Sequence, residues 1–171
     1  MKSFDAMTNE VFISLKKRRI PIANCTVTIN NRLSGVFGRC ITKTMGGKAI
    51  SHKIEIAGFL VKNGSEQGIK DTIAHEYLHT CDGCQNHGAK WKHYASIISD
   101  MYDVTRTSTA ESKGIDERIV AQRVEESYKY VVKCGGCGVE SKYKRMGKNL
   151  KNLNRCICSR CGSKELKLIR L

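Results

Sequence analysis

Three histidines near the middle of this 171-residue chain constrain its fold more than any other feature. His75 and His79 are four residues apart in the run HEYLH, and this spacing places both imidazoles on one face of a helix. His87 follows a glycine-containing turn and can reach the same point from outside the helix. Three protein ligands leave one coordination position open, which is typical of a catalytic zinc site rather than a structural one.

Glu76 comes directly after the first histidine. Zinc binding does not require this carboxylate, so its presence indicates chemistry at the site. Glu76 can accept a proton from a water activated by the metal, as a general base does in peptide hydrolysis. We therefore predict Glu76 as the catalytic residue. The alternative is a chance HExxH on a surface helix, but three of only five histidines fall in the pattern.

Several neighbouring side chains have more than one interpretation. His93 is the second choice for the third metal ligand, and Tyr94, Tyr102 and His93 are all candidates for an oxyanion donor. Cys81 and Cys84 lie between the ligands and could form a redox pair or another metal site. Such cysteines more often pack as small buried hydrophobes, and we favour that interpretation.

The stretch HEYLHTCDGCQNHGAKW resembles the SprT-like zinc metallopeptidases, in which HExxH is followed by a variable loop and then by H-G-x-x-[FW]. The third histidine comes later than in the metzincin pattern, which the chain does not match. Bacterial members often carry the same cysteine-containing insertion, and the family often adds a C-terminal zinc ribbon. The resemblance implies a zincin-like peptidase linked to DNA, which in the best-known members removes proteins crosslinked to DNA.

Two C-x-x-C pairs form a second cluster near the C-terminus. Cys134 and Cys137 are separated by twenty residues from Cys158 and Cys161, a spacing expected of a four-cysteine zinc site. Four thiolates leave no open position, so we predict a structural zinc, which makes two zinc ions per chain. A module of about 44 residues buries too little apolar surface to fold alone, and the metal would stabilise it. Cys156 lacks the same spacing and is predicted to be a spare thiol.

Positive charge gathers in the same C-terminal stretch. Residues 128–171 hold twelve Lys and Arg against two Glu, which is +10 of the chain's formal +14. Interleaved tyrosines favour phosphate contacts combined with base stacking, so we predict binding of nucleic acid, with single-stranded or junction-containing DNA favoured. The alternative is an incidentally basic, solvated surface. The candidate contacts are Tyr130, Lys142, Tyr143, Lys144, Arg145, Lys148 and Lys151.

Hydrophobic spacing predicts the remaining elements. Apolar residues at helical spacing indicate an amphipathic helix over residues 4–18, whose basic end is explained by the helix dipole without nucleic acid. The fold class is therefore α+β, with helices packed on a short sheet and followed by a four-cysteine zinc ribbon, and the family resemblance implies that the first part is a small zincin-like domain. Further strands are expected over 25–29, 37–42 and 52–56, and further helices over 67–80, from about 91, and over 115–127.

These patterns predict a peptidase domain over residues 1–113, a linker helix over 114–127 and a basic ribbon over 128–171. The longest apolar run is too short for a membrane span, and no secretory signal is visible. Nine cysteines without export favour metal binding in a reducing compartment, so a cytoplasmic location is expected. The predicted function is zinc-dependent endopeptidase activity on DNA-associated proteins. A non-catalytic zinc protein that binds nucleic acid and a general cytoplasmic peptidase remain alternatives.

Overall fold

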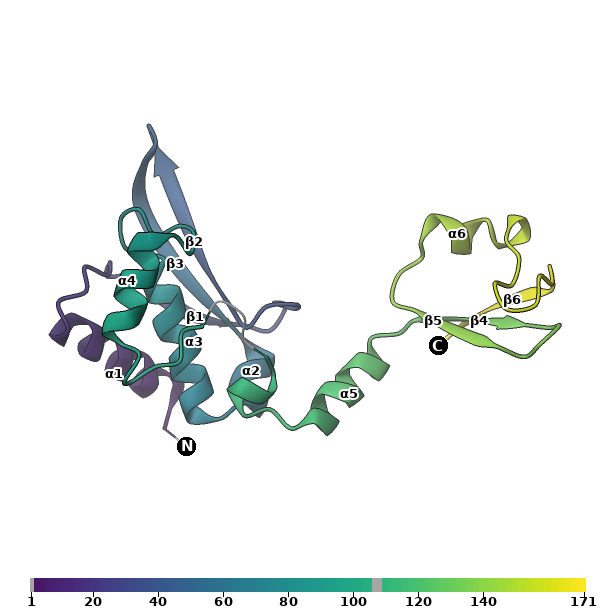
Figure 1. Ribbon diagram of the computed structural model, residues 1–171, viewed down its shortest axis with the longest axis horizontal. Helices are drawn as coiled ribbons and strands as arrows, with labels where there is room; N and C mark the ends of the chain where they lie inside the picture. Colours follow the sequence, from purple (N-terminus) through teal and green to yellow (C-terminus); the bar gives the residue numbers. More distant parts are fainter. Residues whose placement is uncertain (1, 106–108) are drawn as a thin grey trace. The chain divides into compact units, whose positions relative to one another are not determined.

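The computed structural model describes residues 2–105 and 109–171, and it has the predicted mixture of helices and short strands. Contacts divide the chain into two compact units, Met1–Glu117 and Arg118–Leu171. Each unit contains its own three-stranded sheet (Figure 1). The helix over 117–126, expected to be a linker, therefore falls almost entirely within the second unit.

The first unit packs helices on its sheet (Figure 1). Its elements are α1 (Phe4–Lys17), β1 (Thr26–Asn30), β2 (Gly38–Met45), β3 (Lys48–Ala57), α2 (Gly58–Asn63), α3 (Glu66–Leu78), α4 (Ala89–Ile97) and the 3-10 turn η1 (Glu111–Lys113). The strand order is β1-β3-β2, with β1 parallel and β2 antiparallel to the central strand. Helix α3 contacts α1, α4 and both β2 and β3, so it is the central helix of the unit.

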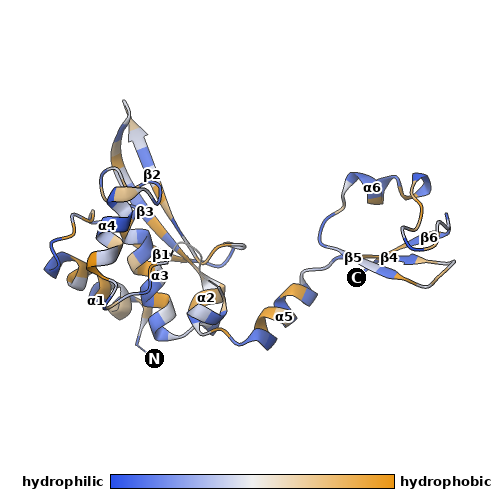
Figure 2. Ribbon diagram, in the orientation of Figure 1, coloured by the Kyte–Doolittle hydropathy of each residue, from blue (hydrophilic) through white to orange (hydrophobic). Residues whose placement is uncertain are grey.

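The second unit is a small antiparallel sheet with strand order β5-β4-β6. Its elements are α5 (Glu117–Glu126), β4 (Tyr130–Cys134), β5 (Glu140–Tyr143), α6 (Lys148–Lys151), the 3-10 turn η2 (Leu153–Arg155) and β6 (Leu166–Arg170). Three buried residues, Tyr130, Val132 and Leu150, form its apolar cluster. Helix α5 buries none of its residues, and apolar and polar positions alternate along it (Figure 2).

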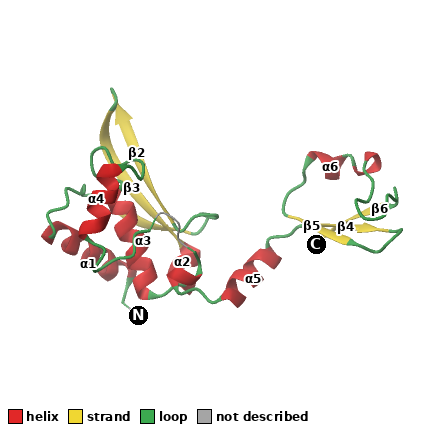
Figure 3. Cartoon of the chain, in the orientation of Figure 1, coloured by secondary structure: helices red, strands yellow, loops and turns green. Residues whose placement is uncertain are grey.

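The sequence predicted the strands and the longer helices of the first unit with two differences, whereas the strands and short helices within the ribbon were not predicted individually. The hairpin of β2 and β3 is longer than expected, because Gly46 and Gly47 adopt positive φ angles of 57° and 77° and close it with a tight turn (Figure 3). Helix α2 was missed because its apolar residues continue the apolar end of β3 without a break. Within residues 2–105 and 109–171, no helix is long and apolar enough to cross a membrane.

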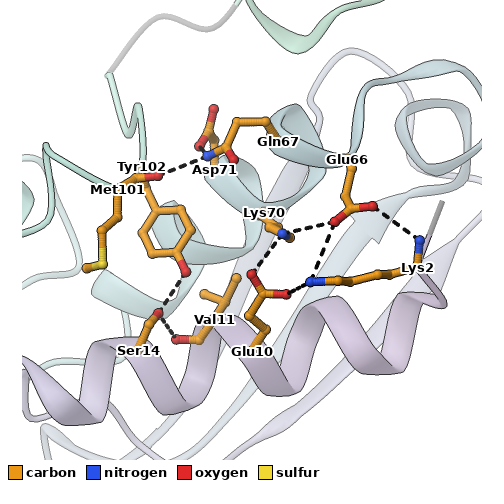
Figure 4. Close-up of polar contacts among 10 residues, drawn as sticks. All are labelled: Lys2, Glu10, Val11, Ser14, Glu66, Gln67, Lys70, Asp71, Met101 and Tyr102. Atoms are coloured by element: carbon orange, nitrogen blue, oxygen red, sulfur yellow. Dashed lines mark hydrogen bonds and ion pairs between the residues drawn. The ribbon is translucent and has the colours of Figure 1, made fainter.

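Helices α1 and α3 are held together by apolar contacts and by a buried lysine. Met7, Val11 and Leu15 of α1 are buried, as the helical spacing predicts. The Lys70 ammonium of α3 lies 2.8 Å from a carboxylate oxygen of Glu10 and 3.0 Å from one of Glu66 (Figure 4). Because the two partners come from different helices, this cluster fixes α1 against the helix that carries HExxH.

Candidate metal centres

The three predicted histidine ligands converge at the C-terminal end of α3. The Nε2 atom of His75 lies 3.2 Å from Nε2 of His79 and 3.0 Å from Nε2 of His87. Imidazoles bound to one tetrahedral zinc at about 2.0–2.1 Å would place their nitrogens about 3.3 Å apart. The cluster is half-buried and has the dimensions of a three-histidine metal site.

Backbone carbonyls orient two of these rings. Nδ1 of His79 donates to the carbonyl oxygen of Cys84 at 2.7 Å, and Nδ1 of His75 donates to that of Val104 at 3.4 Å. A carbonyl can only accept, so each Nδ1 carries the proton and each Nε2 keeps its lone pair for a metal. Burial together with the neighbouring imidazoles lowers the pKa of His75 to about 4, which also favours the neutral ligand form.

Trp91 forms an apolar wall beside the cluster. Its side chain is buried, and its ring centroid lies 5.0, 5.9 and 4.6 Å from those of His75, His79 and His87. His87 directly precedes Gly88, the N-cap of α4, and Trp91 lies in the first turn of that helix, so the entry to α4 supplies both a candidate ligand and the wall. A low-polarity surface of this kind strengthens electrostatic interactions at the metal position.

Glu76 is buried between α3 and strand β2. Burial raises the pKa of its carboxyl to about 7, while a hydrogen bond from the backbone N–H of Cys40 opposes that rise. A Cβ atom at Gly38 would lie 2.9 Å from both Cγ and Oε1 of Glu76. The strand can therefore approach this carboxylate closely only because position 38 lacks a side chain.

The alternative residues near the site have other environments. His93 is exposed on α4 and does not join the three-histidine cluster. The hydroxyl of Tyr102 lies 2.7 Å from that of Ser14 on α1, so its hydrogen bond is made away from the metal ligands. The role of Tyr102 as an oxyanion donor stays a prediction. Tyr94 stays a prediction, since its ring contacts only His93 among the described ring pairs.

Cys81 and Cys84 are both fully buried. Burial raises the pKa of the Cys81 thiol to about 12 and also raises that of Cys84. In the part of the chain that the structure describes, no third ligand group joins them. They pack as small hydrophobes, and the backbone of Cys84 orients His79.

The four ribbon cysteines form the second cluster. Cys134 and Cys161 have their sulfurs 3.6 Å apart, and so do Cys137 and Cys158. Four thiolates on one tetrahedral zinc would lie about 3.8 Å apart, so the cluster also has the dimensions of a metal site. Backbone N–H groups of Cys161 and Arg160 lower the pKa of Cys158 to about 6, which favours the thiolate that binds metal.

Cys156 lies outside this cluster. Its sulfur lies 3.7 Å from the carbonyl oxygen of Asn149 and 3.6 Å from that of Asn152, contacts that a free thiol can make. The thiol is half-buried at the edge of a hollow with a partly apolar lining.

The candidate nucleic-acid residues divide between different surroundings. Tyr130 is only 9% exposed in the apolar cluster of the ribbon, so it is a core residue and the prediction that it stacks on bases is wrong. The ammonium groups of Lys142 and Lys144 lie 5.9 and 5.6 Å from the ring centroid of Tyr128. The remaining candidates are exposed on β5 or on the segment that follows it, and these are Tyr143, Arg145, Lys148 and Lys151.

A hollow of about 280 Å³ lies next to Tyr143. Leu150, Leu153 and Ile157 contribute apolar side chains to its lining, together with Tyr143 itself. Ile157 is 60% exposed, so part of this apolar surface faces solvent. The ribbon therefore presents a hollow with a partly apolar lining on a strongly basic module.

The fold and the histidine cluster define an α+β protein whose HExxH helix could hold a metal ion. Comparison with protein families matches residues 3–112 to the SprT-like family. The match covers more than half of the chain, and the protein belongs to this family, which is generally of metallopeptidase type. A search of curated proteins finds no match. The matched range contains the histidines and Glu76 and ends before the ribbon cysteines.

Sequence patterns did not indicate the groups that surround the ligands. Gly38, the N–H of Cys40 and the carbonyls of Cys84 and Val104 act through backbone atoms or through the absence of a side chain. Only the turn-forming tendency of glycine distinguished Gly38, and that tendency does not explain its position within a strand. These contacts depend on the packing of β2 and of the loops against α3, which a sequence motif does not specify.

Proposed function

We propose that the protein is a zinc-dependent endopeptidase that acts on DNA-associated proteins, including proteins crosslinked to DNA. His75, His79 and His87 would hold the catalytic zinc, and Glu76 would act as the general base. The observation that carries this proposal is the buried Glu76 carboxylate next to a three-histidine cluster. A purely structural zinc needs no such group, and a buried carboxyl without a chemical task would destabilise the fold.

The environment of Glu76 suits a group that takes up and releases a proton near neutral pH. Burial raises its pKa to about 7, and efficient general bases have pKa values close to the working pH. A bound zinc would supply a Lewis acid for the peptide carbonyl and lower the pKa of water. Glu76 would take a proton from the attacking water and return it to the leaving amine. Gly38 and the N–H of Cys40 would fix the carboxylate for both transfers.

The ribbon is proposed to hold its own structural zinc and to bind nucleic acid. Its formal charge of +10, which four thiolates holding one Zn²⁺ would lower by two, supports contacts with phosphates, and the partly apolar hollow beside Tyr143 is large enough for an unpaired base. Exposed Lys148 and Lys151 of α6 belong to the same segment as Leu150, which lines the hollow. We therefore favour single-stranded DNA, or DNA with unpaired bases, over an intact duplex.

Casein cleavage measured with and without single-stranded DNA tests this function. The full chain should cleave casein, DNA should increase the rate, and a variant ending at Glu117 should cleave slowly without responding to DNA. Glu76→Gln is the matched inactive control. Cleavage that DNA does not change would support the general-peptidase alternative. DNA binding without any cleavage by the zinc-loaded chain would support the non-catalytic alternative and contradict the proposal.

A further inference from the structure

Side chains at every fourth position of α3 follow one line along the helix. Gln67, Asp71, His75 and His79 are successive members, which we call the α3 ladder. Residues four apart lie one above another on a helix face. The two metal-ligand candidates are the last two members, so the first two share their face.

Three members of the α3 ladder bond to one segment of the chain, residues 101–104. Gln67 donates to the carbonyl oxygen of Met101 at 2.9 Å. The carboxylate of Asp71 accepts the N–H of Asp103 at 3.2 Å, and His75 donates to the carbonyl of Val104 at 3.4 Å. Figure 4 shows Gln67 and Asp71 on α3 next to Met101. Asp103, which Asp71 binds, directly precedes Val104, whose carbonyl orients His75.

Asp71 is unusual among these groups because it is a carboxylate with only 3% of its surface exposed. Burial raises its pKa, whereas the bond from Gln67 and the charge of buried Lys113 oppose that rise. The Oδ1 atom of Asp71 accepts two hydrogen bonds, one from the side-chain amide of Gln67 at 2.7 Å and one from the backbone N–H of Asp103 at 3.2 Å. A buried carboxylate lowers the stability of the fold unless its hydrogen bonds are made, so the bonds from Gln67 and Asp103 are needed at this position.

We propose that Asp71 is a positioning residue for the histidine metal site and acts through the backbone of Asp103 and Val104. By accepting the N–H of Asp103, the Asp71 carboxylate fixes the backbone at residues 103 and 104. The carbonyl oxygen of Val104 then stays where it can accept the Nδ1 proton of His75. Groups that orient a metal-bound histidine typically change metal affinity about 10- to 100-fold when removed. This inference rests on the metal site of the proposed function, but it concerns metal affinity and not peptide cleavage.

The test is zinc affinity of the full chain, measured by competition with a chromogenic chelator. A parallel Co²⁺ titration separates the two sites, because four thiolates and three imidazoles give different spectra. Asp71→Ala should weaken the histidine site about tenfold or more and leave the ribbon site unchanged. Asp71→Asn keeps an oxygen for the Asp103 N–H and should retain most of the affinity.

Tyr102→Phe is the matched control. It removes a 2.7 Å hydrogen bond from the same segment, but one directed to Ser14 on α1 rather than to the α3 ladder. It should leave zinc affinity within about threefold of the wild type. Unchanged affinity in Asp71→Ala, an equal loss in Tyr102→Phe or in Asp71→Asn, or an equal loss at the ribbon site would each overturn the proposal. A wild type that binds zinc at the histidines without cleaving casein would contradict the proposed function and leave this inference standing.

Discussion

The histidine cluster and the cysteine cluster differ in how much buried apolar core supports each of them independently of a metal. His75 lies in α3 and His79 is its C-cap residue, and the apolar residues Ile69 and Ile73 of this helix are fully buried against α1 and the sheet. The cysteines occupy turns of a module whose apolar cluster contains three buried residues, none below 6% exposure. A metal would therefore bind to an already folded helix in the first unit and would hold the fold together in the second.

The two clusters also differ in the number of ligands they offer a metal and in the groups beside them. Three imidazoles leave a position for substrate or water, and a buried carboxylate lies one residue from a ligand. Four thiolates close the second site, and no comparable base accompanies them among the described residues. We infer that one metal position serves catalysis and the other serves folding. The predictions that follow test this contrast, from the largest expected effect to the smallest.

Metal removal should affect the two units very differently. A strong chelator should unfold the ribbon, because zinc binding to such modules contributes about 10–16 kcal/mol of apparent free energy, while the first unit keeps its buried core. Amide resonances of residues 130–170 should lose dispersion while those of α1 and α3 keep theirs. Loss of dispersion in both sets of resonances together would contradict the inference that only the second unit needs metal to fold.

Replacing Glu76, the proposed general base, should abolish peptide cleavage without removing metal. Glu76→Gln preserves side-chain size and all three histidines, so zinc content should stay constant while casein cleavage falls by at least about a hundredfold. Rates and metal content are measured on the same preparation. Retained cleavage would exclude Glu76 as the base, and lost zinc would make it a structural or ligand residue.

Gly38→Ala should disturb the general base through packing. The added Cβ would lie 2.9 Å from Glu76 and from the methyl group of Thr72, so the carboxylate must shift. We expect kcat for casein to fall about tenfold or more, with little change in KM or zinc content. In a Glu76→Gln background the same substitution should have almost no further effect on the rate. An equal loss in both backgrounds would indicate general misfolding instead.

The smallest expected effect concerns base stacking on the ribbon. Tyr143→Leu removes an exposed ring beside the hollow and should weaken single-stranded DNA binding about fivefold or more, since stacking contributes about 1–3 kcal/mol per base. Duplex binding should change little, because paired bases cannot stack there. Tyr128→Leu is the control, as that ring is covered by Lys142 and Lys144. Equal losses for both substitutions would contradict a role for the hollow.

Sequence reasoning predicted which histidines and which cysteines come together because their spacing reflects elementary geometry. His75 and His79 meet through the helical repeat, and the C-x-x-C pairs meet because each lies in a tight turn. It misjudged Tyr130 because composition does not distinguish a central strand such as β4 from an edge strand such as β5. Tyr130 and Tyr143 are directly paired in the sheet, yet one is 9% and the other 37% exposed. It also missed Gly38 and Asp71, whose effects depend on contacts between segments far apart in the chain.

The most direct test of two sites with separate tasks is the number of zinc ions per chain, measured by native mass spectrometry. The wild type should carry two zinc ions. His79→Ala should carry one and keep a folded ribbon, whereas Cys137→Ser should lose the ribbon zinc and keep the one at the histidines. One zinc ion in the wild type, or loss of both in His79→Ala, would contradict the account.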